Sequence, residues 1–237
     1  MTRRILWFAL PFLAVALVHL IAAAVQAQTL AAVTQALLMP TLALVLLAPH
    51  PDAAGNGWWP RTRLFALVAL FFSFLGDLLP RFFDGDLSFA VLIGCFFFAQ
   101  LAWIAALYPR LRHSIVVVQR WRLVLYAVLA IIVLVLCLPA AGALAPLVIV
   151  YAVALTAMAI LATGWGSFGT VGGLLFLVSD ALIAIFTFRP EFDPGQPARS
   201  LLIMTTYIAA QFLLVLAVRQ FSEKARQPVV GRGIAGV

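Results

Sequence analysis

Charged residues are scarce in this chain. Asp, Glu, Lys and Arg together make up 10% of its 237 residues, and 65% of the residues are apolar. In soluble domains about a quarter of the residues are charged. With a mean hydropathy of +1.14, the composition excludes an ordinary soluble globular domain.

Residues that bind metals or carry out redox chemistry are also few. The two cysteines, Cys95 and Cys137, lie in apolar stretches, where they are typical of small buried side chains. The three histidines are scattered, and the chain has no H-E-x-x-H motif or Cys/His cluster. Phosphate-binding and dinucleotide-binding glycine motifs are missing, and "GWGSFG" has Trp165 where a G-x-S-x-G nucleophile motif needs glycine. We therefore expect neither a metal site nor a cofactor.

Long apolar runs, in contrast, recur along the whole chain. A helix that spans a bilayer needs roughly 20 apolar residues, and eight runs of about this size are present. They cover approximately residues 5–25, 30–48, 64–79, 87–107, 123–138, 144–162, 169–188 and 201–218. The links are short, and the alternating pattern of barrel strands is missing. The sequence therefore predicts an all-α protein, a single integral membrane domain over residues 1–237 that forms a bundle of eight transmembrane helices.

Basic residues gather on one side of this arrangement. With the N-terminus inside, only Arg81, Arg189 and Arg199 of the fifteen basic residues fall outside. The twelve on the cytoplasmic side are Arg3, Arg4, Arg61, Arg63, Arg110, Arg112, Arg120, Arg122, Arg219, Lys224, Arg226 and Arg232. Because cytoplasmic loops carry an excess of Lys and Arg, we expect both termini in the cytoplasm and the protein in a bacterial inner membrane. Topology and anionic lipids then explain the net charge of +7 without nucleic acid.

The first run has an alternative interpretation as a cleavable signal peptide, because "MTRR" precedes it and "VQAQ" follows it. Its apolar stretch is longer than the roughly 7–15 residues that signal peptides use. Removing it would also weaken the charge bias. We expect a retained first helix.

Two of the eight acidic residues lie inside apolar runs: Asp77 in the third and Asp180 in the seventh. An intramembrane charge costs roughly 2.5–3.5 kcal/mol on insertion scales, so such residues usually face a polar interior or a pathway. At a rise of 1.5 Å per residue, the two acids lie roughly 20 and 16 Å from the cytoplasmic ends of their helices and can share one depth. No Lys or Arg lies within any run, so each acid must be protonated, hydrogen-bonded or in contact with internal water.

Small and polar residues accompany both aspartates at helical spacing, which predicts one polar stripe on each helix. On the third run the stripe consists of Ser73, Gly76, Asp77 and Pro80. On the seventh run it consists of Gly169, Gly172, Gly173, Phe176, Asp180 and Thr187. The spacing of Gly169 and Gly173 is typical of a close contact between membrane helices.

Further polar side chains in the runs are candidates for binding substrate or positioning water. These residues are Gln35, Ser73, Gln100, Ser179, Tyr207 and Gln211. For each of them the competing interpretation is an ordinary hydrogen bond between helices, which membrane bundles use widely. His19 is a weaker candidate of the same kind.

Five segments together resemble the successive motifs of a known family. They are "QALLMPTLALVLL" (35–47), "FSFLGDLL" (72–79), "GCFFFAQLAW" (94–103), "GGLLFLVSDALIAI" (172–185) and "TYIAAQFLLVLAV" (206–218). In order and spacing they look like the YhhN-like, or lysoplasmalogenase, family. The resemblance implies an eight-helix membrane hydrolase that cleaves the vinyl ether bond of lysoplasmalogens to a fatty aldehyde and a glycerophospho-alcohol. Asp77 and Asp180 stand at the family's acidic positions.

The chain departs from this family at two places. The family often has Lys where this chain has Gln35, and His followed by Tyr where it has Gln100 and Trp103. The second helix thus lacks a basic group and the fourth lacks a histidine, while both aspartates are retained.

Vinyl ether hydrolysis suits a pair of acids. Protonation of the β-carbon gives an oxocarbenium ion, which water captures as a hemiacetal that collapses to aldehyde and alcohol. One group must donate a proton and another must stabilise positive charge. Two carboxyls in a low-dielectric site titrate as a pair, so one can stay protonated while the other is ionised. The sequence predicts Asp77 and Asp180 as this pair without assigning the two roles.

Two other functions fit the same residues. Proton-coupled carriers also place acids on inward faces of interrupted helices, and the aspartates could instead form only structural contacts.

For hydrolysis we expect a lysophospholipid, water and membrane lipids as partners. The headgroup, the chain length and the oligomeric state stay open. The product separates the classes, because an enzyme releases aldehyde in detergent, where no gradient exists.

Overall fold

The computed structural model describes residues 3–49 and 59–224, and all regular structure in these residues is helical. This confirms the all-α prediction. Eight of the helices have 18 residues or more. They are α1 (Arg3–Ala24), α2 (Gln28–Leu47), α3 (Trp59–Leu78), α4 (Gly85–Leu107), α6 (Leu123–Ala141), α7 (Ala145–Ala162), α8 (Gly166–Phe188) and α9 (Ala198–Lys224). Each helix overlaps one predicted run.

Six segments of the described chain are long and apolar enough to cross a membrane, and the longest, Arg120–Phe188, contains α6, α7 and α8. The number of spans and the side of each terminus stay predictions. The loop around Asn56 and the tail with Arg226 and Arg232, on which the topology partly depends, lie outside the described residues.

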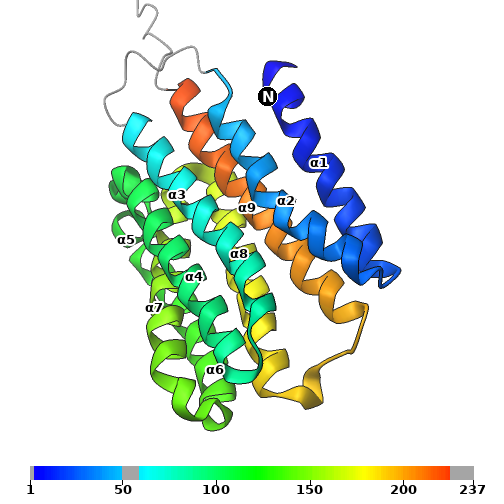
Figure 1. Ribbon diagram of the computed structural model, residues 1–237. Coiled ribbons are helices and arrows are strands. Elements are labelled where there is room, and N and C mark those ends of the chain that lie inside the picture. The colour runs from blue at the N-terminus through cyan, green and yellow to red at the C-terminus, as the bar shows by residue number, and fades with distance from the viewer. Residues whose placement is uncertain (1–2, 50–58, 225–237) are drawn as a thin grey trace, which may run out of the picture.

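The long helices run roughly side by side in one bundle (Figure 1). α9 contacts α1, α2, α3 and α8, while α6 contacts α7 and α8 on the other flank. The start of α1 and the end of α9 lie at the same end of the bundle (Figure 1). At the opposite end lie the α1–α2 turn, the α3–α4 link and the α8–α9 link.

α1 is an integrated part of the bundle. Phe12 is 1% exposed and stacks on Phe212 of α9, with ring centroids 5.4 Å apart. His19 is also buried, and its Nδ1 lies 3.0 Å from Thr34 Oγ1 of α2. These contacts give α1 both apolar and polar partners on the helices beside it.

The glycines of α8 allow close helix contacts, as the small-residue spacing predicted. A Cβ at Gly169 would clash with the Ala162 carbonyl oxygen at the end of α7, and one at Gly173 would lie 3.0 Å from Ala159 Cα of α7. Gly172 faces α9, where a Cβ would lie 3.1 Å from the Ala210 carbonyl oxygen. The prediction was wrong for Thr187, which is exposed and donates back to the Ile183 carbonyl of its own helix. The close contact therefore holds the part of α8 that precedes Asp180.

The end of α9 differs from the prediction that Arg219 lies beyond the last span. α9 continues to Lys224, and Arg219 is 2% exposed. Its Nη1 donates to the carbonyl oxygens of Val45 and Ala48, at 3.1 Å for Ala48. These carbonyls belong to the C-terminal end of α2, where they have no partner within the helix and where a positive charge is favourable. The predicted run ended at Val218 because the next residue, Arg219, is charged. Hydropathy alone does not show that this arginine is buried.

The link between α4 and α6 is more structured than the sequence predicted. It contains two 3₁₀ turns, Tyr108–His113 and Arg120–Arg122, on either side of the short helix α5 (Ile115–Val118). Arg110 in this link donates through Nε to the Gly164 carbonyl at 2.8 Å. The link is thereby attached to the turn that precedes α8.

Candidate active site

Asp77 and Asp180 line one cavity of about 550 Å³. Asp77 lies one residue before the end of α3, and Asp180 lies within α8. Both carboxyls are buried in the fold, at 6% and 8% exposure. The remaining wall comes from α1, α2, α4 and α9, with polar residues toward the α1–α2 and α8–α9 links. These polar residues are His19, Gln26, Gln28, Gln35, Arg81, Ser179, Gln196, Arg199, Ser200 and Tyr207. We refer to this space as the polar cavity.

Both oxygens of Asp77 accept hydrogen bonds from side chains of other helices. Gln35 of α2 donates through Nε2 to Oδ1 at 3.1 Å, and the Tyr207 hydroxyl of α9 donates to Oδ2 at 2.9 Å. Hydrogen bonds to both oxygens stabilise a carboxylate. Asp77 therefore sits in surroundings that suit a negative charge.

Tyr207 is held in place by aromatic packing. Its ring lies edge-on to Phe96 of α4 and Phe176 of α8, with centroids 5.7 and 5.8 Å away. One turn further along α9, Gln211 donates through Nε2 to Ser73 Oγ of α3 at 2.9 Å. α3 and α9 are thus joined by two polar contacts, which fix the Asp77 carboxyl relative to α9.

A cation lies beside Asp77, although no Lys or Arg lies within any of the predicted runs. Arg81 donates through Nη2 to Gln35 Oε1 at 2.5 Å and through Nε to the Asp77 backbone carbonyl at 3.4 Å. The predicted third run ends at residue 79, so Arg81 counted as a loop residue. Its position four residues after Asp77 places it on the same helical face, and α3 passes directly into the 3₁₀ turn Leu79–Phe82 that contains it.

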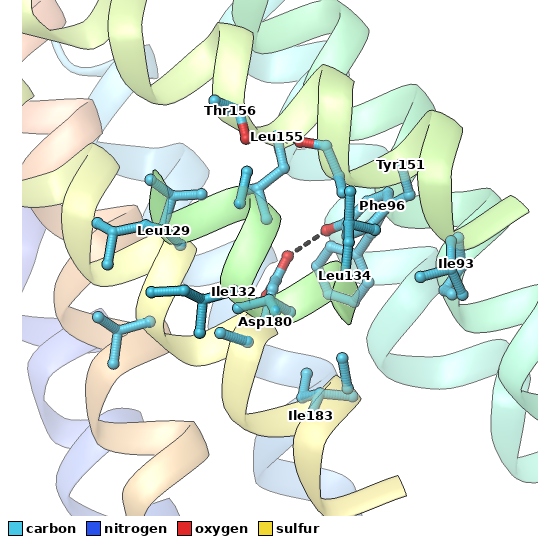
Figure 2. Close-up of a pocket in the computed structure, with 18 of the residues that line it drawn as sticks. Ile93, Phe96, Leu129, Ile132, Leu134, Tyr151, Leu155, Thr156, Asp180 and Ile183 are labelled. Atoms are coloured by element: carbon cyan, nitrogen blue, oxygen red, sulfur yellow. Dashed lines mark hydrogen bonds between the residues drawn. The ribbon is translucent and has the colours of Figure 1, made fainter. Parts of the chain in front are cut away.

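Asp180 has different surroundings. Its Oδ2 accepts a hydrogen bond from the Tyr151 hydroxyl of α7, and the Tyr151 oxygen lies 3.5 Å from Gln100 Nε2 of α4. Figure 2 shows this bond surrounded by aliphatic and aromatic side chains. Within the described part of the chain no hydrogen bond reaches Asp180 Oδ1. Tyr151 was not predicted from the sequence, because the residues three and four positions away from it on the helix are all apolar, whereas Tyr207 has Gln211 one turn away.

Asp180 also borders a second space, an apolar pocket of about 180 Å³ between α4, α6, α7 and α8 (Figure 2). Its wall is aliphatic and aromatic apart from Asp180, Tyr151 and Thr156. The residues that line both spaces are Leu92, Phe96, Asp180 and Ile183. Asp180 therefore stands where the polar cavity meets the apolar pocket, whereas Asp77 lines only the polar cavity.

The predicted substrate-binding residues fall into two groups. Gln35, Ser179 and Tyr207 line the polar cavity, and Ser179 Oγ also donates to the Ile203 carbonyl at 3.3 Å. The other three are Ser73, Gln100 and Gln211, which are 0% exposed and line neither space. These three residues instead contact other side chains: Gln211 donates to Ser73, and Gln100 contacts Tyr151, which lines the apolar pocket.

The side chains at the site provide few of the ligands that a metal ion needs. Among residues 3–49 and 59–224, no three His, Cys, Asp or Glu side chains come together in a way that could hold one. What the polar cavity does provide is two carboxyls, the Tyr207 hydroxyl, four glutamine amides and two guanidinium groups. The Tyr151 hydroxyl reaches Asp180 from the second space described above. Such groups can transfer protons and stabilise charge.

Comparison with known proteins supports the resemblance seen in the motifs. A search of curated proteins and a search of solved structures each found no match to this chain. The sequence model of the YhhN family matches residues 30–218, which covers most of the chain from α2 to α9 and includes both aspartates. The chain therefore belongs to the YhhN family.

Proposed function

We propose that this protein is a membrane-embedded hydrolase that cleaves the vinyl ether bond of lysoplasmalogen-type lysolipids. Its products would be a fatty aldehyde and a glycerophospho-alcohol. The observation that carries the proposal is the position of Asp77 and Asp180 on one cavity, in surroundings that differ in the way the reaction needs. Membership of the YhhN family is compatible with such an activity.

The surroundings favour Asp180 as the acid and Asp77 as the carboxylate. Asp77 accepts two hydrogen bonds and has Arg81 nearby, which favours its ionised form. Asp180 borders the apolar pocket, where an unpaired charge is costly. Its Oδ2 is occupied by the Tyr151 hydroxyl, so Oδ1 is the atom that would carry and donate the proton.

The steps follow from these roles. The proton of Asp180 adds to the β-carbon of the enol ether, and the π electrons move so that an oxocarbenium ion forms at the carbon bonded to oxygen. The Asp77 carboxylate stabilises this cation, because a charge that the fold already holds in place needs no reorganisation when the opposite charge develops. Water then adds to the cationic carbon, and its released proton returns to the carboxylate pair. The resulting hemiacetal breaks its bond to the glycerol oxygen, which takes up the hydroxyl proton, and leaves the aldehyde.

The mouth of the polar cavity suits the headgroup of such a lipid. Arg81 and Arg199 both line it, and guanidinium groups bind phosphate well. Arg199 is paired with the Asp193 carboxylate at 2.8 Å, whereas Arg81 donates to the uncharged Gln35 amide and the Asp77 backbone carbonyl. Arg81 is therefore the better placed of the two for a phosphodiester. Arg81 thus supplies positive charge beside Gln35, where the family often has Lys.

Proton-coupled transport is the alternative for the same aspartates. It was suggested by Pro80 and by the glycines near Asp180, which could interrupt their helices. α8 is one helix from Gly166 to Phe188, whereas α3 ends at Leu78 and passes into the 3₁₀ turn that contains Pro80. We favour hydrolysis because membership of the YhhN family is compatible with it and because the helix of Asp180 is uninterrupted. We also propose that the protein crosses a bacterial inner membrane with both termini in the cytoplasm, on the basis of its distribution of basic residues. The polar cavity would then open toward the non-cytoplasmic side.

Aldehyde release from a lysoplasmalogen by the purified protein in detergent tests the proposal. Asp77→Asn and Asp180→Asn should each lower turnover by about 10²–10⁴-fold, and the double variant should lose little more, because groups that act together are not additive. Asp84→Asn, in the exposed α3–α4 link, is the control and should turn over like the wild type. Wild-type turnover in either single variant at equal folded protein would refute the acid pair.

Reaction in D₂O tests the protonation step. Because the proposal places the new proton on carbon, the aldehyde should carry one deuterium on the carbon next to the carbonyl. An aldehyde without that deuterium would exclude protonation at carbon. A protein that releases no aldehyde, yet moves protons with a solute in vesicles, would be a carrier.

A further inference from the structure

We propose that the apolar pocket beside Asp180 binds the hydrocarbon chain of the substrate, so that the lipid lies across Asp180 with its headgroup in the polar cavity. This inference rests on the proposed hydrolysis and adds the orientation of the substrate and the residues that select its chain. The two spaces share four wall residues, including Asp180 itself, so one extended molecule can occupy both.

The chemistry of the bond requires this orientation. In an alkenyl ether the carbon that receives the proton belongs to the hydrocarbon chain, and the carbon that receives water is bonded to the ether oxygen. The proton donor must therefore lie on the chain side and the water on the headgroup side. Asp180 borders the apolar pocket and Asp77 does not, which matches a chain in the pocket and water in the polar cavity.

The pocket opens toward the lipid-facing surface. Its wall includes Leu129 and Ile132 of α6 and Val178 of α8, which are 41%, 50% and 46% exposed. Leu155 of α7, also in the wall, is 5% exposed. The pocket thus extends from an apolar outer surface to the Asp180 carboxyl, and a chain can enter from the bilayer between α6 and α8 without crossing water.

Shape, rather than hydrophobicity, must select the chain. Lipid tails are as apolar as leucine side chains, so moving a chain from bilayer to pocket gains little from the hydrophobic effect. What changes with chain length is the fit against the wall. Ala130 and Val133 of α6 are both half-buried wall residues, and substitutions there alter the space without touching Asp180 or its hydrogen bonds.

The experiment compares kcat/KM for lysoplasmalogens that share a headgroup and differ in chain length. Ala130→Leu narrows the pocket and should lower the ratio of long-chain to short-chain kcat/KM by about tenfold, the effect of roughly one misfitting methylene. Val133→Ala enlarges the pocket and should shift the ratio the other way. Ala127→Leu, one turn away on the exposed face of α6 and outside both spaces, is the matched control and should keep the wild-type ratio.

The possible outcomes separate the two proposals. No aldehyde from the wild type at any chain length refutes the hydrolysis itself. Aldehyde release with the same ratio in all four proteins refutes the chain site and leaves the hydrolysis standing. If Ala130→Leu does not fold, Val133→Ala decides alone, since an unchanged ratio in this variant overturns the inference and a shift toward longer chains supports it.

Discussion

Gly76 offers a stringent test of the geometry around the two aspartates. It precedes Asp77 in α3 and lines the polar cavity. A Cβ at this position would lie 2.7 Å from Phe96 Cε2 and 2.8 Å from Cδ2, closer than carbon atoms normally approach. Phe96 is 4% exposed and packs edge-on against Tyr207 and Phe176, so its ring cannot turn away freely. Gly76→Ala must therefore displace a ring that forms part of the wall of both spaces.

The loss of stability expected for Gly76→Ala follows from the cost of overpacking. Inserting one carbon into a packed site typically costs about 1–3 kcal/mol, and for a chain of this size each kcal/mol shifts the midpoint of thermal unfolding by about 2–4 °C. Gly76→Ala should thus lower the midpoint in detergent by about 2–12 °C and reduce aldehyde release per folded molecule. Gly94→Ala on α4 is the control, because a Cβ there meets no atom within 4 Å. Replacing this helical glycine should leave the midpoint unchanged or raise it.

A second substitution shows whether Phe96 is the cause. Phe96→Leu removes the ring atoms that a Cβ on Gly76 would meet. The double variant should then be more stable than the sum of the two single changes predicts, with a coupling of about 1–3 kcal/mol. A Gly76→Ala protein with wild-type stability, or a double variant whose losses simply add, would refute this account of the contact.

Three further predictions concern other parts of the chain. Arg219→Met should destabilise the protein by about 1–3 kcal/mol, because it leaves buried carbonyl oxygens at the end of α2 without their donor; an unchanged thermal midpoint would contradict that role. Reporters fused after Val237 and near Asn56 should both be cytoplasmic, and finding the Asn56 reporter outside would overturn the topology. Chelators should leave aldehyde release intact, since the described residues offer no cluster of metal-binding side chains; inhibition that one specific metal reverses would show the opposite.

The helices and the two acids could be predicted because both depend on local features of the sequence. Bilayer thickness requires long apolar runs, so each long helix of the described chain overlaps a run that hydropathy marks. Asp77 and Asp180 are conspicuous because charge within such a run is rare. The stripe around Asp77 also identified Ser73 as a neighbour on the same helix, and its contact with Gln211 of α9 is of the kind that joins membrane helices.

The partners of the acids could not be predicted, because they depend on how the helices turn toward one another. Hydropathy ends the third run before Arg81, although helical spacing keeps this residue on the Asp77 face. Tyr151 has no polar residue one turn away in the sequence, yet the packing of α7 against α8 directs its hydroxyl at Asp180. Gln100 was expected at the substrate, but the rotation of α4 places it behind Tyr151. These differences come from tertiary packing, which the spacing of residues along one helix does not determine.

In the proposed hydrolysis, the unequal surroundings of the two carboxyls would also set the direction of the reaction. The sequence presents the acids in similar settings, "FLGDLL" and "LVSDAL", and two equivalent carboxyls would not determine which one donates a proton. The fold makes them unequal, since α2 and α9 give Asp77 two hydrogen-bond donors while α4, α6 and α7 surround Asp180 with apolar side chains. The two carbons of an enol ether double bond also differ, because the chain carbon takes the proton and the oxygen-bound carbon takes water. Only one orientation of the lipid would bring the chain carbon to Asp180 and the oxygen-bound carbon to the polar cavity. In the proposed reaction, the asymmetry of the bundle would therefore orient the bond as well as activate it.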